Sequence, residues 1–331
     1  GFIFPPFGGI RGGLAQSSFQ ISYGTAANES GNSVFPASDG GFLIVGNSGT
    51  NLLFIKTDAL GNVQIQKTYG GAGNDFGNSV VETQDGGYAI LSRTNSFGAG
   101  QDDALVIKLD ASGNLQWAKT YGLPDNEQPR IIRTTKTGEI FIVGVTNSAG
   151  AGGTDIMILK LGASGNILWQ KTYGGAYGEL PHQIDFTRDG GLILVGFRHD
   201  YVTQREVLLM KTDSMGSVQW AKVYRDGLWN IGQGIEETVR MTKWVGGSIE
   251  EFYISGYTTS YGAGAEDIFV FKTNNTGNIL WSKTYGGTGM EISRGVVATA
   301  NGLLVPGFTT SFGSGGGDIY LLALDTNGNL Q

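Results

Sequence analysis

Short runs that alternate hydrophobic and polar residues, or that are rich in β-branched and aromatic side chains, follow one another along most of the chain. One stretch contains four such runs: GNSVVETQ (77–84), YAILSRT (88–94), DALVIKLD (103–110) and LQWAKTYG (115–122). Turn residues separate them, as in DGG (85–87), which is typical of antiparallel hairpins. Helical periodicity is absent from the sequence. The pattern therefore predicts a unit of four antiparallel strands.

This four-strand pattern is repeated along the chain. Segments such as GNLQWAKTYG (113–122), GNILWQKTYG (165–174) and GNILWSKTYG (277–286) are nearly identical and close on a tyrosine. The six tyrosines at this place are Tyr23, Tyr69, Tyr121, Tyr173, Tyr224 and Tyr285. A period of about fifty residues is that of a β-propeller blade. We expect an all-β, six-bladed β-propeller with four antiparallel strands per blade.

The two ends of the chain predict how the ring closes. The last unit stops at GNLQ (328–331), where its outer strand should begin, and LAQSSFQISYG (14–24) carries the missing pattern. Phe19 stands where other units have tryptophan. We expect this N-terminal strand to complete the last blade, which removes two exposed sheet edges. Residues 17–331 are then the propeller.

Residues 1–16 fit no blade and form an aromatic arm rich in Gly and Pro, with Phe2, Phe4 and Phe7. Two interpretations remain open. The arm lies along the propeller surface, or it docks on another subunit or a cell-surface partner and so forms an oligomer. Because Gly1 is not an initiator methionine, we expect a processed or engineered N-terminus.

Composition restricts the classes of function. Hydrophobic residues make up 40% of the chain and aromatics 11%, so the 56 glycines do not indicate disorder. Charged residues make up only 15%, which favours a secreted or cell-surface β-protein. The net charge of -7 argues against nucleic acid as a partner, and no apolar run is long enough for a membrane span. With no cysteine, thiolate catalysis and disulfides are excluded.

The repeated elements KTYGG, DGG, SFGAG and GNxxW resemble those of the secreted β-propeller repeat proteins of bacteria and archaea. The likeness covers roughly residues 17–331. It implies the propeller fold and an extracellular location, and it implies little about chemistry.

An acidic residue follows the repeated tyrosine by six positions in five units: Glu29, Asp75, Glu127, Glu179 and Glu291. Two interpretations are open. Each carboxylate accepts backbone N–H bonds that fasten one blade to the next, or the acids form a ring that binds a polar ligand or a cation such as Ca²⁺. Carboxylates roughly 8 Å apart repel by about 2 kcal/mol at an effective dielectric near 20. A ring would therefore need compensating cations or amides. No other cofactor is expected.

Three positions further on, the residues are polar but differ between units: Asn32, Asn78, Arg130, His182, Gln233 and Arg294. Asymmetric recognition requires such differences, so Arg130, His182 and Arg294 are candidate binding residues near the propeller axis; solvated channel lining is the alternative. The fourth and fifth units add Arg198 and His199 in the loop 197–206, and Trp229. This cluster could stack on and hydrogen-bond a sugar, or it is a solvated loop.

Signatures of catalysis are absent from the sequence. The chain has only two histidines, which excludes a His-rich zinc site, and it has neither a GxSxG elbow nor a phosphate-binding GK[ST] loop. We therefore expect a non-catalytic binding or structural module at the cell surface, acting in adhesion or assembly through protein contacts. A carbohydrate-binding propeller is the alternative, and a polysaccharide-cleaving enzyme is the less favoured one.

Overall fold

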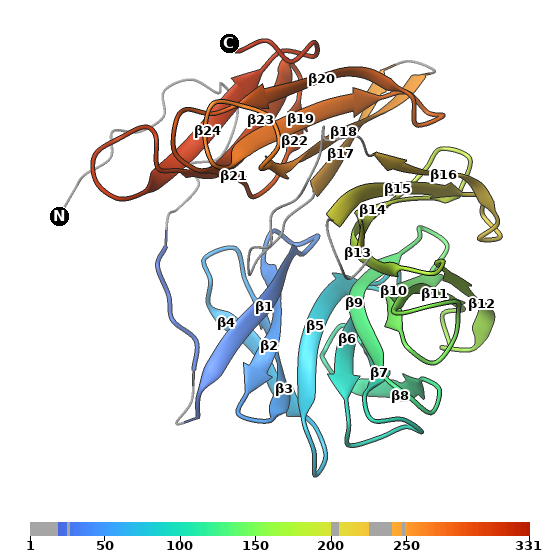
Figure 1. The fold of residues 1–331 in the computed structure, drawn as a ribbon. Coiled ribbons are helices and arrows are strands. Elements are labelled where there is room, and N and C mark those ends of the chain that lie inside the picture. The colour runs from blue at the N-terminus through green and yellow to red at the C-terminus, as the bar shows by residue number, and fades with distance from the viewer. Residues whose placement is uncertain (1–18, 25–26, 200–204, 225–239, 247–248) are drawn as a thin grey trace.

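The structure is a computed structural model that describes residues 19–24, 27–199, 205–224, 240–246 and 249–331 (Figure 1). These residues form strands and no helix, and all the named strands pair antiparallel, which confirms the all-β class. The predicted boundary between the arm and the propeller, with Phe2, Phe4 and Phe7, lies outside the described residues.

The strands form six four-stranded sheets that follow chain order. The first three sheets consist of β1 Glu29–Pro36, β2 Phe42–Ser48, β3 Asn51–Thr57 and β4 Val63–Tyr69; β5 Asp75–Glu82, β6 Tyr88–Thr94, β7 Asp103–Leu109 and β8 Leu115–Tyr121; β9 Glu127–Thr134, β10 Ile140–Thr146, β11 Asp155–Leu161 and β12 Ile167–Tyr173. The others consist of β13 Gly178–Phe186, β14 Leu192–His199, β15 Arg205–Thr212 and β16 Val218–Tyr224; β17 Arg240–Gly246, β18 Ile249–Thr258, β19 Asp267–Thr273 and β20 Ile279–Tyr285; β21 Glu291–Ser293, β22 Val297–Thr299, β23 Gly302–Thr309 and β24 Asp318–Leu324.

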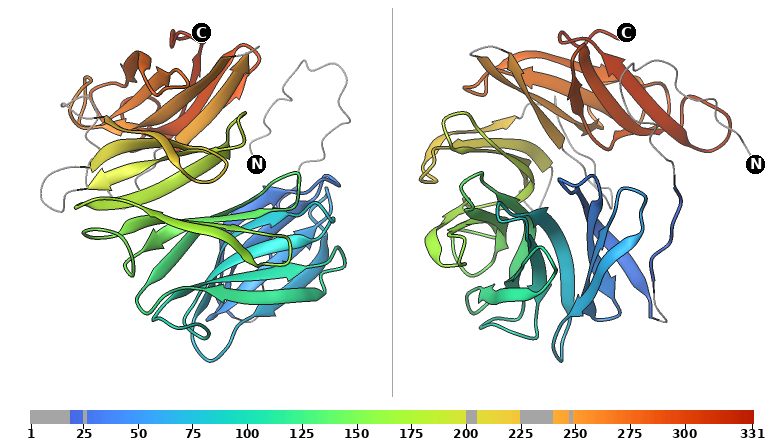
Figure 2. Two further views of the ribbon diagram at one scale, coloured as in Figure 1. Left: turned by 90° about the vertical axis from the view of Figure 1, so that its right-hand side faces the viewer. Right: turned by 180° about the vertical axis from the view of Figure 1, so that it is seen from behind.

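Hydrophobic clusters join each sheet to the next one along the chain. Ala104 and Val106 of β7, for example, pack with Met157 and Leu159 of β11 in one buried cluster. Five such clusters connect the six sheets in order. The sheets therefore follow a curved row, with β1–β4 at one end and β21–β24 at the other (Figures 1 and 2).

The repeated tyrosine and the GN turn are explained by contacts between neighbouring sheets. The Tyr121 hydroxyl donates to Gly165 O at 2.7 Å, and a Cβ atom on Gly165, where φ is 74°, would lie 2.9 Å from the Trp117 ring. Tyr173, Tyr224 and Tyr285 make the same bond to the turn of the following sheet. Glycine is therefore required at this turn by its backbone angle and by the aromatic ring beside it.

Residues 19–24 lie against the first sheet in the way that the outer strand of one sheet lies against the next sheet. The Tyr23 hydroxyl donates to Gly61 O at 2.7 Å, and the Phe19 ring contacts Phe42 at a centroid distance of 6.0 Å. A Cβ atom on Gly61 would meet Phe19 and Ile21 at 2.8 Å. This segment thus makes the contacts that Tyr121 and Trp117 make elsewhere.

The last sheet lacks an outer strand in the part of the chain that the structure describes. Its first strand is divided into β21 and β22, and β24 has β23 as its only strand partner there. Ile319 and Leu321 of β24 are 92% and 60% exposed, whereas the equivalent Ile268 and Val270 of β19 are fully buried. The structure therefore does not pair residues 19–24 with β24, and closure of the ring stays a prediction.

Candidate functional site

The acidic residues at the start of the first strands are buried and hydrogen-bonded. Asp75, Glu127 and Glu291 are 0% exposed, and Glu179 is 5% exposed. Glu127 accepts the Leu123 N–H at 2.7 Å and the Thr146 hydroxyl at 2.8 Å. Such bonds tie the loop after an outer strand to the next sheet. This arrangement agrees with the interpretation in which each carboxylate accepts N–H bonds that fasten one sheet to the next. These four acids do not form a ring that is open to solvent.

The variable position three residues further on is a β-bulge. In four sheets the pairing of the first and second strands skips one residue: Asn32, Asn78, Arg130 and His182. A bulged residue has no partner in the ladder, and the bulge re-aims its side chain. The variable position of the repeat is therefore the bulged position. Pairing of the strands does not fix the side chain there, so it can have a different role in each sheet.

The bulged asparagines bridge neighbouring sheets. The Asn32 side-chain amide donates to Gly77 O at 2.8 Å, and the Asn78 amide donates to Pro129 O at 2.9 Å. Asn78 Oδ1 also accepts the Arg93 backbone N–H at 3.2 Å. These bonds hold the inner strands of the first three sheets together.

Arg130 occupies the same place in β9 but is bonded differently. Its Nε is buried, and no hydrogen-bond acceptor among the described residues reaches it. Burial lowers the pKa of the Arg130 guanidinium, because a charged group is disfavoured away from water. A buried donor without an acceptor is costly, so this guanidinium is ready for an acceptor from a ligand.

Three of the four bulged residues line one cavity of about 460 Å³. Its lining consists of Asn32, Asn47, Phe76, Asn78, Arg93, Gln128, Pro129 and Arg130. Four amide side chains and two guanidinium groups therefore converge, and none of the described lining residues is acidic. In a chain of net charge -7, this cavity is a local concentration of positive charge and hydrogen-bond donors.

Arg93 is held on one side of this cavity. Its guanidinium lies 5.2 Å from the centroid of the Phe76 ring and 3.8 Å from Asp102 Oδ2. The ion pair is long and about one third exposed, so it is weak. Stacking on Phe76 orients the guanidinium while most of its donors stay available.

The structure does not bring the other predicted binding residues into this cavity. Arg198 pairs with Glu206 at 2.6 Å and lies over the Tyr177 ring at 4.6 Å. The His182 ring contacts the Phe197 ring in a tilted arrangement at a centroid distance of 4.7 Å, and Arg294 is exposed in the last sheet. His199 ends β14, opposite Gly178. Trp229 and Gln233 lie outside the described residues.

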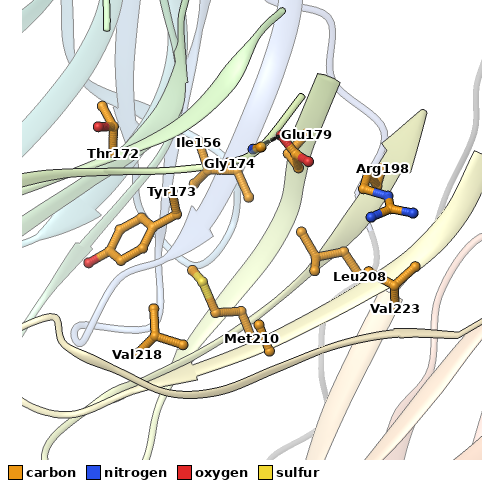
Figure 3. A pocket seen from close by; sticks show the side chains of 12 residues that line it. Ile156, Thr172, Tyr173, Gly174, Glu179, Arg198, Leu208, Met210, Val218 and Val223 are labelled. Carbon is orange, nitrogen blue, oxygen red and sulfur yellow. Dashed lines mark hydrogen bonds between the residues drawn. The ribbon is translucent and has the colours of Figure 1, made fainter. Parts of the chain in front are cut away.

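A second cavity, of about 430 Å³, lies between the third and fourth sheets (Figure 3). Its walls are mostly apolar, with Leu208, Met210 and Val223, and Glu179 and Arg198 lie at one end. Glu179 differs from the other acids because Arg198 replaces the threonine that pairs with Glu127. Its bond from the Gly175 N–H is 3.3 Å long. Burial, followed by the charge of Asp155, raises the pKa of Glu179.

Sequence reasoning missed Asn47, Phe76, Arg93 and Gln128 of the first cavity. Asn47 and Arg93 occupy the same position of the second strand, and this position varies between units, so its variation was also a signal available in the sequence. Sequence reasoning also missed a second set of buried acids, Asp103, Asp155 and Asp267, each of which begins a third strand. Their recurrence before the runs ALVIKL, IMILKL and IFVFKT was a signal available in the sequence.

The described residues bring together no group of three or more His, Asp or Glu side chains suited to a metal ion. None of them forms a helix long and apolar enough to cross a membrane.

No protein-family model and no curated protein matches the chain. Among solved structures, a Dyadobacter fermentans protein of unknown function matches with a TM-score of 0.50 at 13% identity, over 90% of this chain and 94% of that one. A Lactobacillus plantarum protein matches with a TM-score of 0.54 at 13% identity, over 90% and 82%.

A third match is the NanB sialidase of Streptococcus pneumoniae, with a TM-score of 0.53 at 10% identity, over 89% of this chain and 68% of that one. The fold is β-propeller-like. At such low identity the likeness extends to the fold alone, so the chemistry of this propeller-like chain has to be argued from its own residues.

Proposed function

We propose that the six sheets are the blades of one closed propeller, with residues 19–24 as the outer strand of the last blade. Two observations support this. Residues 19–24 already make the contacts to the first sheet that an outer strand makes, through Tyr23 and Gly61. The edge and face of β24, with Ile319 and Leu321 exposed, are what such a strand and the first blade would cover.

We further propose that this propeller is a non-catalytic, extracellular or cell-surface module that binds an acidic glycan in the cavity of Asn32, Asn78 and Arg130. The observation that carries the proposal is that three bulged side chains, one from each of three sheets, line one cavity. Two guanidinium groups also line this cavity, and none of its described lining residues is acidic. Amides hydrogen-bond sugar hydroxyls, and a guanidinium matches the two oxygens of a carboxylate.

The low content of charged residues supports the extracellular location. The adhesion and assembly route through residues 1–16 lies outside the described residues, so the cavity is the better-supported site. Catalysis is not part of the proposal, because the cavity lining offers no described acid or histidine that could act as general acid or base.

The test uses two probes that differ only in charge: trigalacturonate and its fully methyl-esterified form, titrated by calorimetry. We expect trigalacturonate to bind and the ester to bind at least about tenfold more weakly, since a charge-assisted pair contributes about 1.5–3 kcal/mol. Arg130→Gln should remove this preference. Arg294→Gln is the matched control, because Arg294 is the predicted counterpart of Arg130 in the last sheet but lies outside the cavity.

Equal binding of both probes by the wild-type protein would contradict recognition of the carboxylate. An absence of binding across an array of acidic and neutral glycans would contradict the carbohydrate proposal as a whole.

A further inference from the structure

Two carboxyl groups from neighbouring sheets meet beside the glycine that follows an outer-strand tyrosine. A Cβ atom on Gly122 would lie 1.5 Å from Asp103 Oδ1 and 2.9 Å from Glu127 Oε2. The two oxygens therefore border the same point. Asp103 begins β7 of the second sheet and Glu127 begins β9 of the third, and the two residues are 1% and 0% exposed.

The same pairing recurs at two other boundaries. Beside Gly174, the Cβ position lies 1.6 Å from Asp155 Oδ1 and 2.7 Å from Glu179 Oε2. Beside Gly286, it lies 2.0 Å from Asp267 Oδ1 and 2.5 Å from Glu291 Oε2. Three repeats of one arrangement make it a property of the fold rather than of one loop.

The aspartate oxygens at these boundaries have no donor. Oδ1 of Asp103, Asp155 and Asp267 is buried without a hydrogen-bond partner among the described residues. The other oxygen is occupied: Asp103 Oδ2 accepts the Gly100 N–H at 3.0 Å, and Asp267 Oδ2 accepts the Gly264 N–H at 3.1 Å. An ionised Oδ1 at this place would be desolvated, unpaired and next to a second carboxylate.

Glu291, in contrast, is supplied with donors that favour its ionised form. Glu291 accepts the Gly287 N–H at 2.7 Å and the Thr309 hydroxyl at 2.6 Å. Burial opposes ionisation of Glu291, but these bonds outweigh it and lower its pKa. Each carboxylate oxygen accepts two hydrogen bonds, so Oε2 can still accept one from the aspartate.

The repeat itself contains a neutral version of the pair. At the boundary of the first two sheets, Asn51 Oδ1 lies 2.1 Å from the Cβ position of Gly70, and Asp75 Oδ2 lies 2.9 Å from it. Asn51 thus takes the place of the aspartate. An amide has the shape of a protonated carboxyl and carries no charge, so two carboxylates do not repel each other at this boundary.

We propose that Asp103, Asp155 and Asp267 are protonated in the folded protein and donate their Oδ1–H to Glu127, Glu179 and Glu291, so that three protons bind neighbouring sheets together. Each proton gives the orphaned Oδ1 a partner and removes the repulsion between the two carboxylates. The cohesion of these boundaries then depends on pH. A divalent cation is the competing occupant, but it requires six or more oxygen ligands, and the glutamate oxygens already accept N–H and O–H donors.

The sign of the pH dependence follows from the second boundary. Burial raises the pKa of Asp155, and burial is also the largest cause that raises the pKa of Glu179. A carboxyl group whose pKa is raised in the folded state stabilises the fold fully at a pH below its ordinary pKa. This stabilisation is lost as the pH rises through the pKa of the folded state. Other charged or titratable groups lie near these pairs: Arg93 pairs with Asp102, the chain neighbour of Asp103, at 3.8 Å. The charge of Arg198 acts on Glu179, and the charge of Glu291 acts on Tyr320.

The test compares the wild-type protein with the triple variant Asp103→Asn, Asp155→Asn and Asp267→Asn by thermal melting from pH 4 to pH 8 in EDTA. We expect the melting temperature of the wild-type protein to fall by several degrees as the pH rises. The triple variant should lose most of this slope and melt above the wild-type protein at pH 8. Asp125→Asn, the same change at an exposed residue, is the control and should keep the slope.

A second measurement does not depend on variant stability. The infrared spectrum of the wild-type protein near pH 6 should contain the C=O band of buried protonated carboxyl groups, and each single Asn variant should lose part of it. Absence of this band would overturn the proposal. A triple variant that is less stable at every pH with an unchanged slope would also overturn it, as would a calcium-dependent rise in melting temperature that the triple variant lacks.

Discussion

Truncation of Ile319 distinguishes a closed ring from an open row of sheets. Ile319 is 92% exposed on β24, and the equivalent Ile268 on β19 is fully buried between two sheets. If the first sheet packs on the last one in solution, Ile319 is buried as Ile268 is. Ile319→Ala then removes buried methyl and methylene groups and leaves a cavity.

The expected magnitudes are well separated. Replacing a buried isoleucine by alanine costs about 2–5 kcal/mol of unfolding free energy. A substitution on an exposed surface changes it by about 0.5 kcal/mol or less. The closed ring therefore predicts a loss of several kcal/mol for Ile319→Ala, similar to that for Ile268→Ala.

The assay is urea unfolding of the wild-type protein and both variants, followed by tryptophan fluorescence. Ile268→Ala calibrates the cost at a boundary that the structure already describes as packed. Closure of the ring is refuted if Ile268→Ala destabilises the protein by the expected amount while Ile319→Ala leaves the unfolding midpoint unchanged.

Other predictions concern the repeated boundaries and turns. Gly174→Ala should destabilise the protein by about 1–3 kcal/mol, because the new Cβ would lie 1.6 Å from buried Asp155 Oδ1; Gly175→Ala, which would meet no described atom within 4 Å, should be nearly neutral in thermal melting. Asp85 of a DGG turn pairs with Lys108 at 2.8 Å. Burial opposes its ionisation, but the bonds from Lys108 and Thr83 prevail and lower its pKa to about 2. The stability that ionised Asp85 adds is complete above its ordinary pKa and is lost as the pH falls through the lowered one. Because this carboxylate is 51% exposed, Asp85→Asn should cost about 1 kcal/mol at pH 6 and clearly less at pH 2, where the carboxylate is half protonated. An equal cost at both pH values would contradict this assignment.

The sequence predicted the repeated fold well because its strong signals are local. Turn residues such as Gly165 and Gly216 take positive φ values, and Trp117 and Trp169 of the preceding outer strands contact them. The alternation of each run sets which side chains are buried. Because these signals are repeated, the strands inferred for one unit could be assigned in the other units as well. Closure could not be verified in the same way, since it depends on two segments at opposite ends of the chain.

The site was only partly predictable. Variation at Asn78 and Arg130 marked a position, but the bulge that aims these side chains depends on the register with the neighbouring strand. Arg93 became a cavity residue through its contact with Phe76, which sequence spacing does not reveal. Arg198 was expected to face a ligand and instead pairs with Glu206, a residue of the adjacent strand.

The most direct measurement of ring closure is a disulfide between residues 21 and 321. Lys119 of β8 lies opposite Val106 of β7, and the repeat places Ile21 and Leu321 at these two positions. The chain has no native cysteine, so the variant Ile21→Cys with Leu321→Cys has only one bond to form. Directly opposed residues of an antiparallel pair bring their Cβ atoms within reach of a disulfide. The account predicts nearly complete cross-linking within a single chain and a raised melting temperature. Free thiols under oxidising conditions, or cross-links only between two chains, would contradict it.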